Sequence, residues 1–586
     1  MPSSSPSPFA HPAAGLLIPV FALRRPDDFG IGDTKAVMEA IDFCKRHGFE
    51  VLQTLPIHDT VGDHSPYNPI SSRALSPTLL TLDLDEASVP GLTRNILQSN
   101  APESWLVQVR EGAVKHGLVH SLKLQILQHA FDQFILQNDQ SLIDEFESFQ
   151  KSESDWLPGY TLFRTLVGEY DNNPHWEQWR PEHQSYDSAE TWLLAHPENE
   201  RLHTTRRSLA YIQWVAHRQW TAVRAHADTQ AIQLMGEISF GVSKSSADVW
   251  QHRELFDTDW SMGTRPVVYF DTNKDSERWG QNWGLPPYRW ENHRSTNFEW
   301  LRRRVQSEAQ YFHICRIDHL RGYFRAYMFP WQGGSQHSEF ALLDENQAAE
   351  KTGGRMPRFV PGPDEDPTTS AMNDLQGREL ISIFREAAGP MFLFAEIMGA
   401  MPDYMRTALE DLQLPSLTFP LLETNENGSI NPASSYRPLS LVSYGNHDHA
   451  PIASIYQNHF IKQNLALQNL LNFAEWQSSP PDSLNEELLA ALQRSLFKTP
   501  CLLAVLMIPD LLGTTLRFNL PGSYGDQTWC ERLDFTLEEL EHHPVYGPRI
   551  ATASRLLRET GRHLTEPHVA KTNSLLAGNS PHSLLR

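Results

Sequence analysis

The chain has few cysteines. Only four occur among 586 residues, and no two of them are spaced as CxxC. This excludes a small disulfide-stabilised secreted fold, in which cross-links replace a large hydrophobic core. We expect reduced thiols in the core of a cytoplasmic protein, at Cys44, Cys315, Cys501 and Cys530.

Positive charge and long apolar runs are also scarce. Lys and Arg number 49 against 71 Asp and Glu, which gives a net charge of −22. Such an acidic chain is poorly suited to nucleic acid or to an anionic membrane, and a neutral polyhydroxy substrate fits it better. The apolar run 13–23 has no preceding Lys or Arg, unlike a signal peptide, and no other run approaches the roughly 18 residues of a membrane span. We therefore expect no nucleic-acid partner and no membrane partner.

The motifs of common cofactor sites are absent as well. The sequence has no GxxxxGK[ST] phosphate loop, no GxGxxG fingerprint, no HExxH pair and no GxSxG elbow. A metal cluster at His447, Asp448 and His449 is the alternative, but these residues have no Cys partner and no calcium-loop pattern. We expect no metal and no other cofactor.

Short apolar runs that alternate with helical patterns are what the chain does contain. Eight parallel strands joined by helices form a (β/α)8 barrel, and the length of the chain leaves room for large insertions. We predict this α/β fold as a single catalytic domain over residues 13–565. The predicted strands are 16–23, 50–56, 233–238, 311–317, 391–395, 416–419, 439–444 and 500–508.

Two insertions and two tails account for the remaining length. Residues 100–230 show apolar spacings of three and four, which predict a helical subdomain. Residues 331–372 are rich in Gly, Pro, Glu and Asp and lack periodicity, which predicts a long loop. Residues 1–12 are expected to be a disordered tail, and 566–586 a polar tail.

Three of the predicted strands end in carboxylates. One leads to Arg316 and Asp318, which alternation places on the same face, a second leads to Glu396 and a third to Asp448. Barrel enzymes carry their catalytic groups at these strand ends. Three carboxylates can cleave a glycosidic bond with retention, because one attacks, one donates a proton and one holds sugar hydroxyls. Taken singly, each has the alternative role of a helix cap or a salt-bridge partner.

The segments around these residues resemble those of the amylomaltases, the 4-α-glucanotransferases of glycoside hydrolase family 77. Residues 316–323, RIDHLRGY, are similar to the nucleophile motif of that family, and the likeness extends along nearly the whole chain. Further matches are FGIGD at 29–33, SPYNP at 65–69, SADVW at 246–250, GQNWGLPPYRW at 280–290, and RFNLPG at 517–522 followed by Trp529.

The resemblance implies a role for each of the three carboxylates. Asp318 would be the nucleophile, Glu396 the general acid/base and Asp448 the stabiliser of the transition state. Arg316 would keep Asp318 ionised and oriented, since a nearby guanidinium lowers the pKa of a carboxyl group.

The resemblance also implies substrate-binding residues around the three carboxylates. His319 and His447 would hydrogen-bond to sugar hydroxyls, and Tyr67 would stack on a sugar ring in the donor subsite. Trp283 would line the cleft, and Asn519 would contact the barrel mouth.

The sequence departs from the family pattern at several of these places. The usual Asp after the third strand is replaced by Glu237, one methylene longer, so the donor-subsite contact that it implies must be re-fitted. Residues 445–450 differ from the usual stabiliser motif on both flanks of His447 and Asp448, and the loop that usually covers the acceptor side keeps only Tyr269 and Phe270. We expect the chemistry to survive, and these departures leave the acceptor preference and the gating by the loop open.

The leading hypothesis is a 4-α-glucanotransferase. It would move 1,4-α-glucan segments between maltooligosaccharides or larger α-glucans such as glycogen, starch and maltodextrin. A hydrolase with the same three carboxylates is one alternative, because only the exclusion of water separates the two activities. A non-catalytic glucan-binding protein is the other alternative, and the intact carboxylates argue against it.

Overall fold

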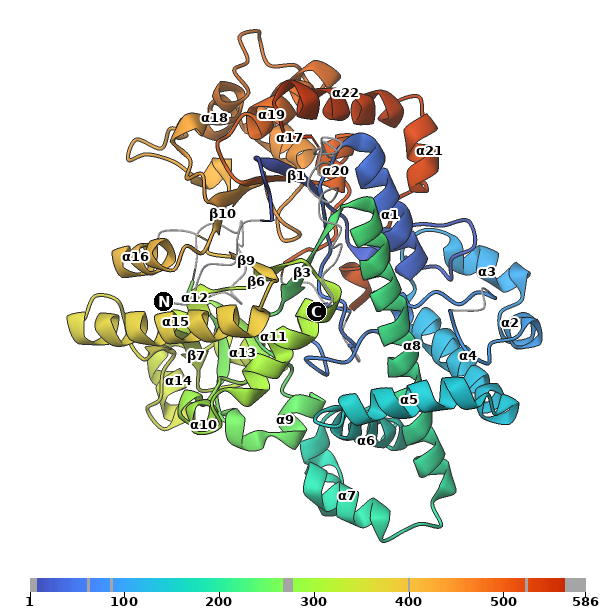
Figure 1. Ribbon diagram of the computed structural model, residues 1–586. Helices are drawn as coiled ribbons and strands as arrows, with labels where there is room; N and C mark the ends of the chain where they lie inside the picture. The colour runs from blue at the N-terminus through green and yellow to red at the C-terminus, as the bar shows by residue number, and fades with distance from the viewer. Residues whose placement is uncertain are drawn as a thin grey trace, which may run out of the picture.

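A closed barrel of eight parallel strands forms the centre of the computed structural model, which describes residues 8–60, 64–84, 88–266, 278–398, 401–521 and 525–563. The strand order is β1-β12-β11-β10-β9-β6-β3-β2, and β1 pairs with both β12 and β2 to close the barrel (Figure 1). The predicted (β/α)8 fold is therefore confirmed. The strands are β1 (Ala13–Leu17), β2 (Val51–Gln53), β3 (Gln233–Ile238), β6 (Ile314–Ile317), β9 (Phe392–Ala395), β10 (Ser416–Thr418), β11 (Ser440–Val442) and β12 (Leu503–Met507).

These strands are the eight that the apolar runs predict, with different ends. Nearly all of their residues are buried, as expected for parallel strands covered on both faces. The first strand ends at Leu17, because Pro19 starts a 3-10 helix, η1 (Val20–Ala22). The fourth begins only at Ile314, because helix α11 (Glu299–Tyr311) continues to Tyr311. The apolar runs therefore predict where each strand lies, but they do not give its ends, because a neighbouring helical turn can be equally apolar.

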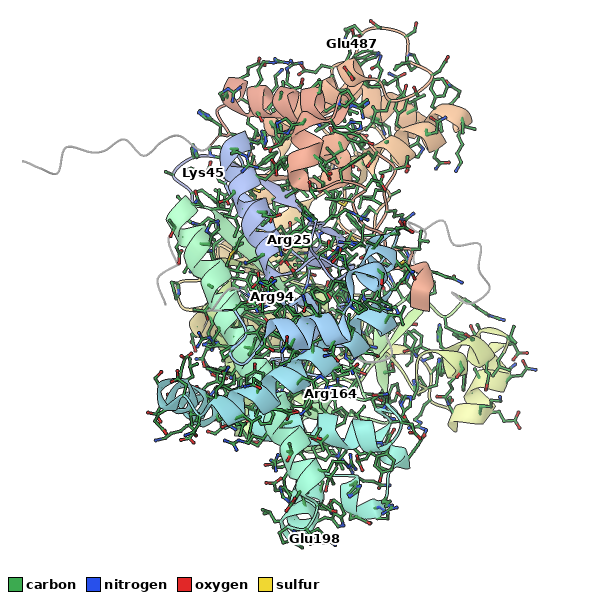
Figure 2. The ribbon with its side chains drawn as sticks, turned by 90° about the vertical axis from the view of Figure 1, so that its right-hand side faces the viewer. Arg25, Lys45, Arg94, Arg164, Glu198 and Glu487 are labelled. Atoms are coloured by element: carbon green, nitrogen blue, oxygen red, sulfur yellow. The ribbon has the colours of Figure 1, made fainter. Side chains whose placement is uncertain are left out.

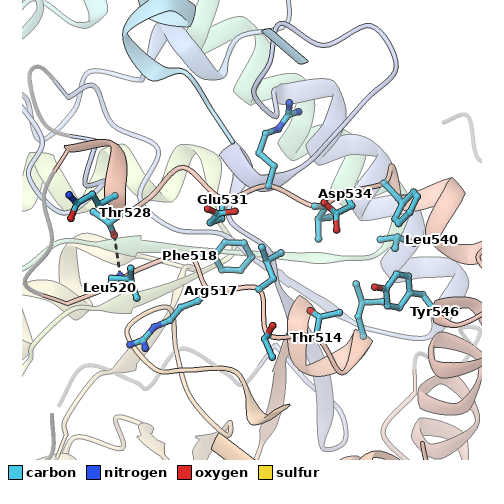
Figure 3. Close-up of a pocket in the computed structure, with 16 residues that line it drawn as sticks. Thr514, Arg517, Phe518, Leu520, Thr528, Glu531, Asp534, Leu540 and Tyr546 are labelled. Carbon is cyan, nitrogen blue, oxygen red and sulfur yellow. Dashed lines mark hydrogen bonds between the residues drawn. The ribbon is translucent and has the colours of Figure 1, made fainter. Parts of the chain in front are cut away.

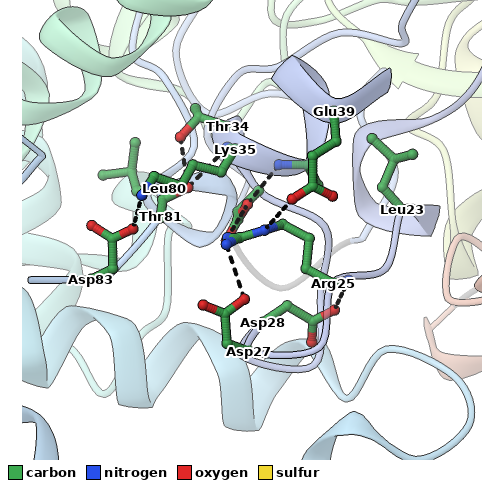
Figure 4. Close-up of polar contacts among 12 residues, drawn as sticks. Leu23, Arg25, Asp27, Asp28, Thr34, Lys35, Glu39, Leu80, Thr81 and Asp83 are labelled. Carbon is green, nitrogen blue, oxygen red and sulfur yellow. Dashed lines mark hydrogen bonds and ion pairs between the residues drawn. The ribbon is translucent and has the colours of Figure 1, made fainter. Parts of the chain in front are cut away.

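A polar network joins the first loop of the barrel to the carboxyl-terminal part of the chain. Arg25 lies 2.9 Å from Asp27 and 3.0 Å from Glu39, and its backbone N–H donates to Asp28 (Figure 4). Asp28 in turn forms a buried ion pair with Arg532. Because both partners are buried, this pair fixes the segment around Arg532 against the loop that follows β1.

The region between β2 and β3 is helical. Helix α8 is 31 residues long and runs back beside α1 (Thr34–His47) to the barrel (Figure 1). Glu198, just before α8, lies at the opposite end of the molecule from Glu487 (Figure 2). The helices are α2 (Arg94–Asn100), α3 (Glu103–Arg110), α4 (His116–Gln137), α5 (Gln140–Ser152), α6 (Leu157–Glu169), α7 (Tyr186–Leu194) and α8 (Glu200–Gln230).

The helical region is tied to the loop that follows β2. Arg164 of α6 lies 3.3 Å from the carboxylate of Asp59, and the Tyr160 hydroxyl donates to the same carboxylate at 2.8 Å. All three side chains are buried. Burial raises the pKa of Asp59, and Arg164 opposes that shift. The insertion thus anchors the segment that leads to Tyr67.

A second, antiparallel sheet stands beside the barrel, in the order β5-β4-β7-β8. Its strands are β4 (Ser261–Thr264), β5 (Gln281–Leu285), β7 (Ala326–Phe329) and β8 (Arg358–Val360). Strand β5 carries Trp283, so this sheet brings a predicted cleft residue to the barrel mouth.

Residues 331–372 are not the long loop that their composition predicts. They contain helices α13 (Ser335–Ala341) and α14 (Glu345–Thr352), strand β8 and the start of α15 (Pro367–Ala388). Trp331, Phe340 and Ala348 are buried against Phe329 and Trp279 in a small core of their own. Helices of two turns are too short to show a clear apolar period, which is why the sequence did not reveal them.

Three predicted features fall wholly or partly on residues that the structure does not describe. The tail 566–586 lies outside the described residues, as do residues 1–7 and the loop residues Tyr269 and Phe270. Within the described part of the chain, no helix is both long and apolar enough to cross a bilayer.

The small core predicts a local loss of stability on truncation. Trp331 is 2% exposed and stacks on Phe340 with ring centroids 4.1 Å apart. We expect Trp331→Ala to remove about 3–5 kcal/mol of local stability and to make residues 331–366 the first site of limited proteolysis. Leu342→Ala, at a side chain that is 78% exposed, is the control. Equal protease resistance in both variants would contradict this assignment.

Candidate active site

Asp318 follows the last residue of β6. Its backbone N–H donates to the carbonyl of Ile238 in β3, which fixes its position at the carboxyl end of the barrel. Its carboxylate accepts a hydrogen bond from the Phe240 backbone N–H at 3.2 Å and lies 3.5 Å from Arg316. Burial raises the pKa of Asp318 to about 6, against the opposing effect of the Arg316 charge, and the charge of Glu396 raises it further.

Arg316 is the centre of a buried charge cluster. Its guanidinium forms an ion pair with Glu237, lies 3.5 Å from Asp318 and 3.3 Å from Glu396, and is 1% exposed. Glu237 and Glu396 lie at the ends of β3 and β9, the two strands that flank β6. Three neighbouring strands therefore direct carboxylates at one guanidinium.

Glu396 is held by the turn that follows Asp318. Its backbone N–H donates to the carbonyl of Ile317, and its side chain accepts a hydrogen bond of 2.8 Å from the backbone N–H of His319. His319 has a left-handed backbone with φ of 44°, which belongs to this turn. The other oxygen of Glu396 faces Arg316, so both oxygens are fixed by neighbours.

Asp448 lies beyond the end of β11. Its carboxylate accepts a hydrogen bond of 2.6 Å from the Asn519 side chain and lies 3.4 Å from His447. Burial alone would raise the pKa of Asp448, but the charge and hydrogen bond of His447, with the hydrogen bond of Asn519, hold it well below its usual range. Asp448 is therefore ionised at neutral pH.

Aromatic side chains pack against the two histidines of the site, His447 and His319. Tyr67 stacks on His447 with ring centroids 4.6 Å apart, and its hydroxyl lies 3.1 Å from the same imidazole. Trp283 meets the edge of His319 with centroids 4.9 Å apart, and Phe240 contacts His319 at 5.1 Å. Aromatic faces of this kind are the usual platforms for the apolar faces of sugar rings.

A cavity of about 580 Å³ is lined by Phe518 and Leu520, the sequence neighbours of Asn519 (Figure 3). Arg517 and Thr528 line it. Both also support the site, because Thr528 donates to the Asn519 side chain at 2.8 Å and Arg517 donates to the backbone carbonyl of Asp448 at 3.0 Å. The three carboxylates are not part of the lining of this cavity.

Comparison with known proteins identifies the family. A family model described as 4-alpha-glucanotransferase, of glycoside hydrolase family 77, matches residues 18–537. The chain belongs to this family. Transfer of α-1,4-glucan segments is accordingly its activity, and the alternatives of a hydrolase or a non-catalytic glucan-binding protein are not favoured.

Individual relatives agree with the family model. The 4-alpha-glucanotransferase of Chlamydia caviae is 27% identical over 92% of this chain and 94% of its own length. That of Thermus thermophilus is 27% identical over 88% of this chain and 94% of its own length. An amylomaltase from Streptococcus agalactiae, solved in complex with acarbose, has the same fold, with a TM-score of 0.73 and 20% identity over 94% of this chain and all of its own.

The residues that the family resemblance predicts lie together at one end of the barrel, with one difference in contact. Glu237 was expected to contact a sugar in the donor subsite, but its side chain has no exposed surface and pairs with Arg316. Asn519 was expected at the barrel mouth, where it bonds directly to Asp448. Among the described residues, no group of three or more His, Cys, Asp or Glu side chains is arranged to hold a metal ion.

Sequence reasoning missed Phe240 and Asn446. Phe240 donates its backbone N–H to Asp318, and Asn446 accepts the backbone N–H of Asp448 at 3.1 Å. Phe240 is apolar, so its residue type does not suggest a role in the site. Its position two residues past the end of β3 could have suggested one, because the residues after barrel strands form such sites. Asn446 lies within the predicted stabiliser motif, but only the structure shows which backbone group it holds.

The raised pKa of Asp318 predicts the acid side of the pH profile. A nucleophilic carboxylate attacks only when ionised, so if Asp318 has the role that the resemblance implies, kcat/KM for maltotriose should fall as the pH drops through about 6 and should level off above it. Initial rates between pH 4.5 and 8 measure this. Recovery of full activity after return to pH 7.5 controls for unfolding, and a rate that stays constant between pH 5 and 7 would contradict the role of Asp318.

Proposed function

We propose that the chain transfers glucan segments by a retaining double displacement in which Asp318 is the nucleophile, Glu396 the general acid/base and Asp448 the stabiliser of the transition state. The observation that carries this proposal is the single guanidinium of Arg316 shared by Asp318 and Glu396. A retaining enzyme needs its two carboxyl groups close together, at about 5–5.5 Å, and one shared cation favours that arrangement.

The surroundings of each carboxylate support its role in the first half of the reaction. Asp318 attacks the anomeric carbon while Glu396 gives a proton to the leaving oxygen. Asp448, ionised and held by Asn519 and His447, stabilises the positive charge that develops on the sugar ring. The product of this step is a glycosyl ester on Asp318.

The second half of the reaction requires a bound acceptor. A sugar 4-hydroxyl gives its proton to Glu396 and attacks the ester, which releases Asp318. Water at roughly 55 M competes, but groups held in a near-attack position reach effective concentrations of about 10⁵ M or more. We propose that Trp283, beside His319, provides part of this acceptor platform and limits the access of water.

We propose maltooligosaccharides, and the larger glucans glycogen, starch and maltodextrin, as donors and acceptors. Tyr67 would stack on a donor sugar, with His447 behind it. Four buried cysteines without disulfides are in keeping with a further proposal, that the enzyme works in the cytoplasm.

The nucleophile can be identified by trapping. Glu396→Gln removes the acid/base and should stop turnover of maltotriose, yet an α-glucosyl fluoride needs no proton to leave and should form a stable covalent adduct. Peptide mass spectrometry should find the adduct on Asp318. Asp318→Asn in the same background should give no adduct, and an adduct on any other residue would disprove the assignment.

Incubation with maltotriose tests the substrate proposal. We expect glucose together with a ladder of longer maltooligosaccharides and almost no rise in total reducing ends, because each transfer conserves the number of glycosidic bonds. Chromatography of the products and a reducing-end assay measure the two quantities. A steady rise in reducing ends without a ladder would show hydrolysis instead, and Asp318→Asn serves as the inactive control.

A further inference from the structure

The loop after β11 contains a compact polar corner formed by Gly445, Asn446 and His449. The Asn446 side-chain oxygen accepts the backbone N–H of Asp448 at 3.1 Å and lies 2.7 Å from Nδ1 of His449. A Cβ atom on Gly445 would come within 2.6 Å of the Cβ of His449, so only glycine allows this packing. The loop therefore holds the His449 ring in one orientation.

These contacts use one nitrogen of His449 inside the loop. Nδ1 lies 2.7 Å from the side-chain oxygen of Asn446 and 3.3 Å from its backbone N–H, so it is engaged in either tautomer. Burial lowers the pKa of His449, which keeps the imidazole neutral at neutral pH. Nε2 is the ring nitrogen left for an outside partner, and a sugar hydroxyl can bond to it in either tautomer because a hydroxyl both donates and accepts.

His449 lies at the barrel mouth, directly after Asp448 in the sequence. Strands β9, β10 and β11 are neighbours in the barrel, and Glu396, Phe419 and His449 follow their respective ends. The His449 ring packs 5.0 Å from Phe419. His449 is half-buried, and none of the described residues bonds to its Nε2. The nitrogen is thus available to a ligand bound next to Asp448.

We propose that His449 determines acceptor specificity through a hydrogen bond between its Nε2 and a hydroxyl of the acceptor sugar. Glu396 takes the proton of the attacking 4-hydroxyl, so a second contact from the same side orients the acceptor ring. This inference rests on the proposed transfer mechanism, and it assigns a role to a residue whose identity the family resemblance left unexplained.

A purely structural role for His449 is the competing explanation, because the imidazole also braces Asn446 and, through it, the backbone of Asp448. The two roles use different nitrogens. His449→Asn places an amide nitrogen near the position of Nδ1, which keeps the contact with Asn446 and removes Nε2. His449→Gln places a polar atom near the position of Nε2 and loses the contact with Asn446.

The experiment separates acceptor binding from the donor half-reaction. With an excess of maltotriose, the apparent KM for glucose as acceptor is measured for the wild type and both variants. The rate at which the first equivalent of fluoride per enzyme is released from α-glucosyl fluoride reports the donor half-reaction, because later turnovers also require an acceptor. His542→Asn, at an exposed histidine on α21 (Leu537–His542), is the matched control, and thermal unfolding confirms that each variant is folded.

We expect His449→Asn to raise the acceptor KM about tenfold, the size of one lost hydrogen bond, while fluoride release changes by less than about twofold. His449→Gln should recover most of the acceptor affinity. An unchanged acceptor KM in His449→Asn, or an equal loss in both assays, would overturn the inference and leave the proposed function standing. A wild-type enzyme that transfers to no acceptor would overturn both.

Discussion

The guanidinium of Arg316 is buried between Glu237, Asp318 and Glu396, and its charge must be shared among three carboxylates. A buried cation without partners is strongly unfavourable, and a buried carboxylate without a cation is equally so. The four groups therefore stabilise one another only when β3, β6 and β9 are in register. The arrangement of the proposed catalytic carboxylates Asp318 and Glu396 is thus a consequence of charge satisfaction inside the barrel.

The sharing of one charge also explains the difference between the carboxylates. Asp318 is buried and receives only part of the Arg316 charge, so its pKa is raised to about 6, whereas Asp448 is held in its ionised form mainly by His447 and Asn519. The environments of the proposed nucleophile and of the proposed stabiliser differ in this way. Such a difference lets similar side chains perform different roles in one cleft.

The insertions support the site at its edges. The helical region holds Asp59, upstream of Tyr67, through Arg164, and the antiparallel sheet carries Trp283 to His319. The carboxyl-terminal segment brings Asn519 to Asp448, and the pair of Arg532 with Asp28 ties that segment to the first loop. The helical region and the carboxyl-terminal segment are therefore attached by polar contacts, and the antiparallel sheet by an aromatic one.

The amino-acid sequence by itself determined the barrel and the three carboxylates. Buried parallel strands appear as short apolar runs, and a charged residue at the end of such a run stands out, as Asp318, Glu396 and Asp448 do. These signals are local, so one sequence is sufficient to find them. The family motifs around them identified the chemistry for the same reason.

The tertiary structure decided which groups contact each other. Glu237 was expected to contact a sugar, but closure of the barrel buries it against Arg316. Asn519 reaches Asp448 across 71 positions of sequence, and Nδ1 of His449 is held by Asn446 in the same loop. The two-turn helices of residues 331–372 form only because Trp331 and Phe340 share a core. Burial and long-range partners depend on the packed fold, and no local pattern of residues encodes them.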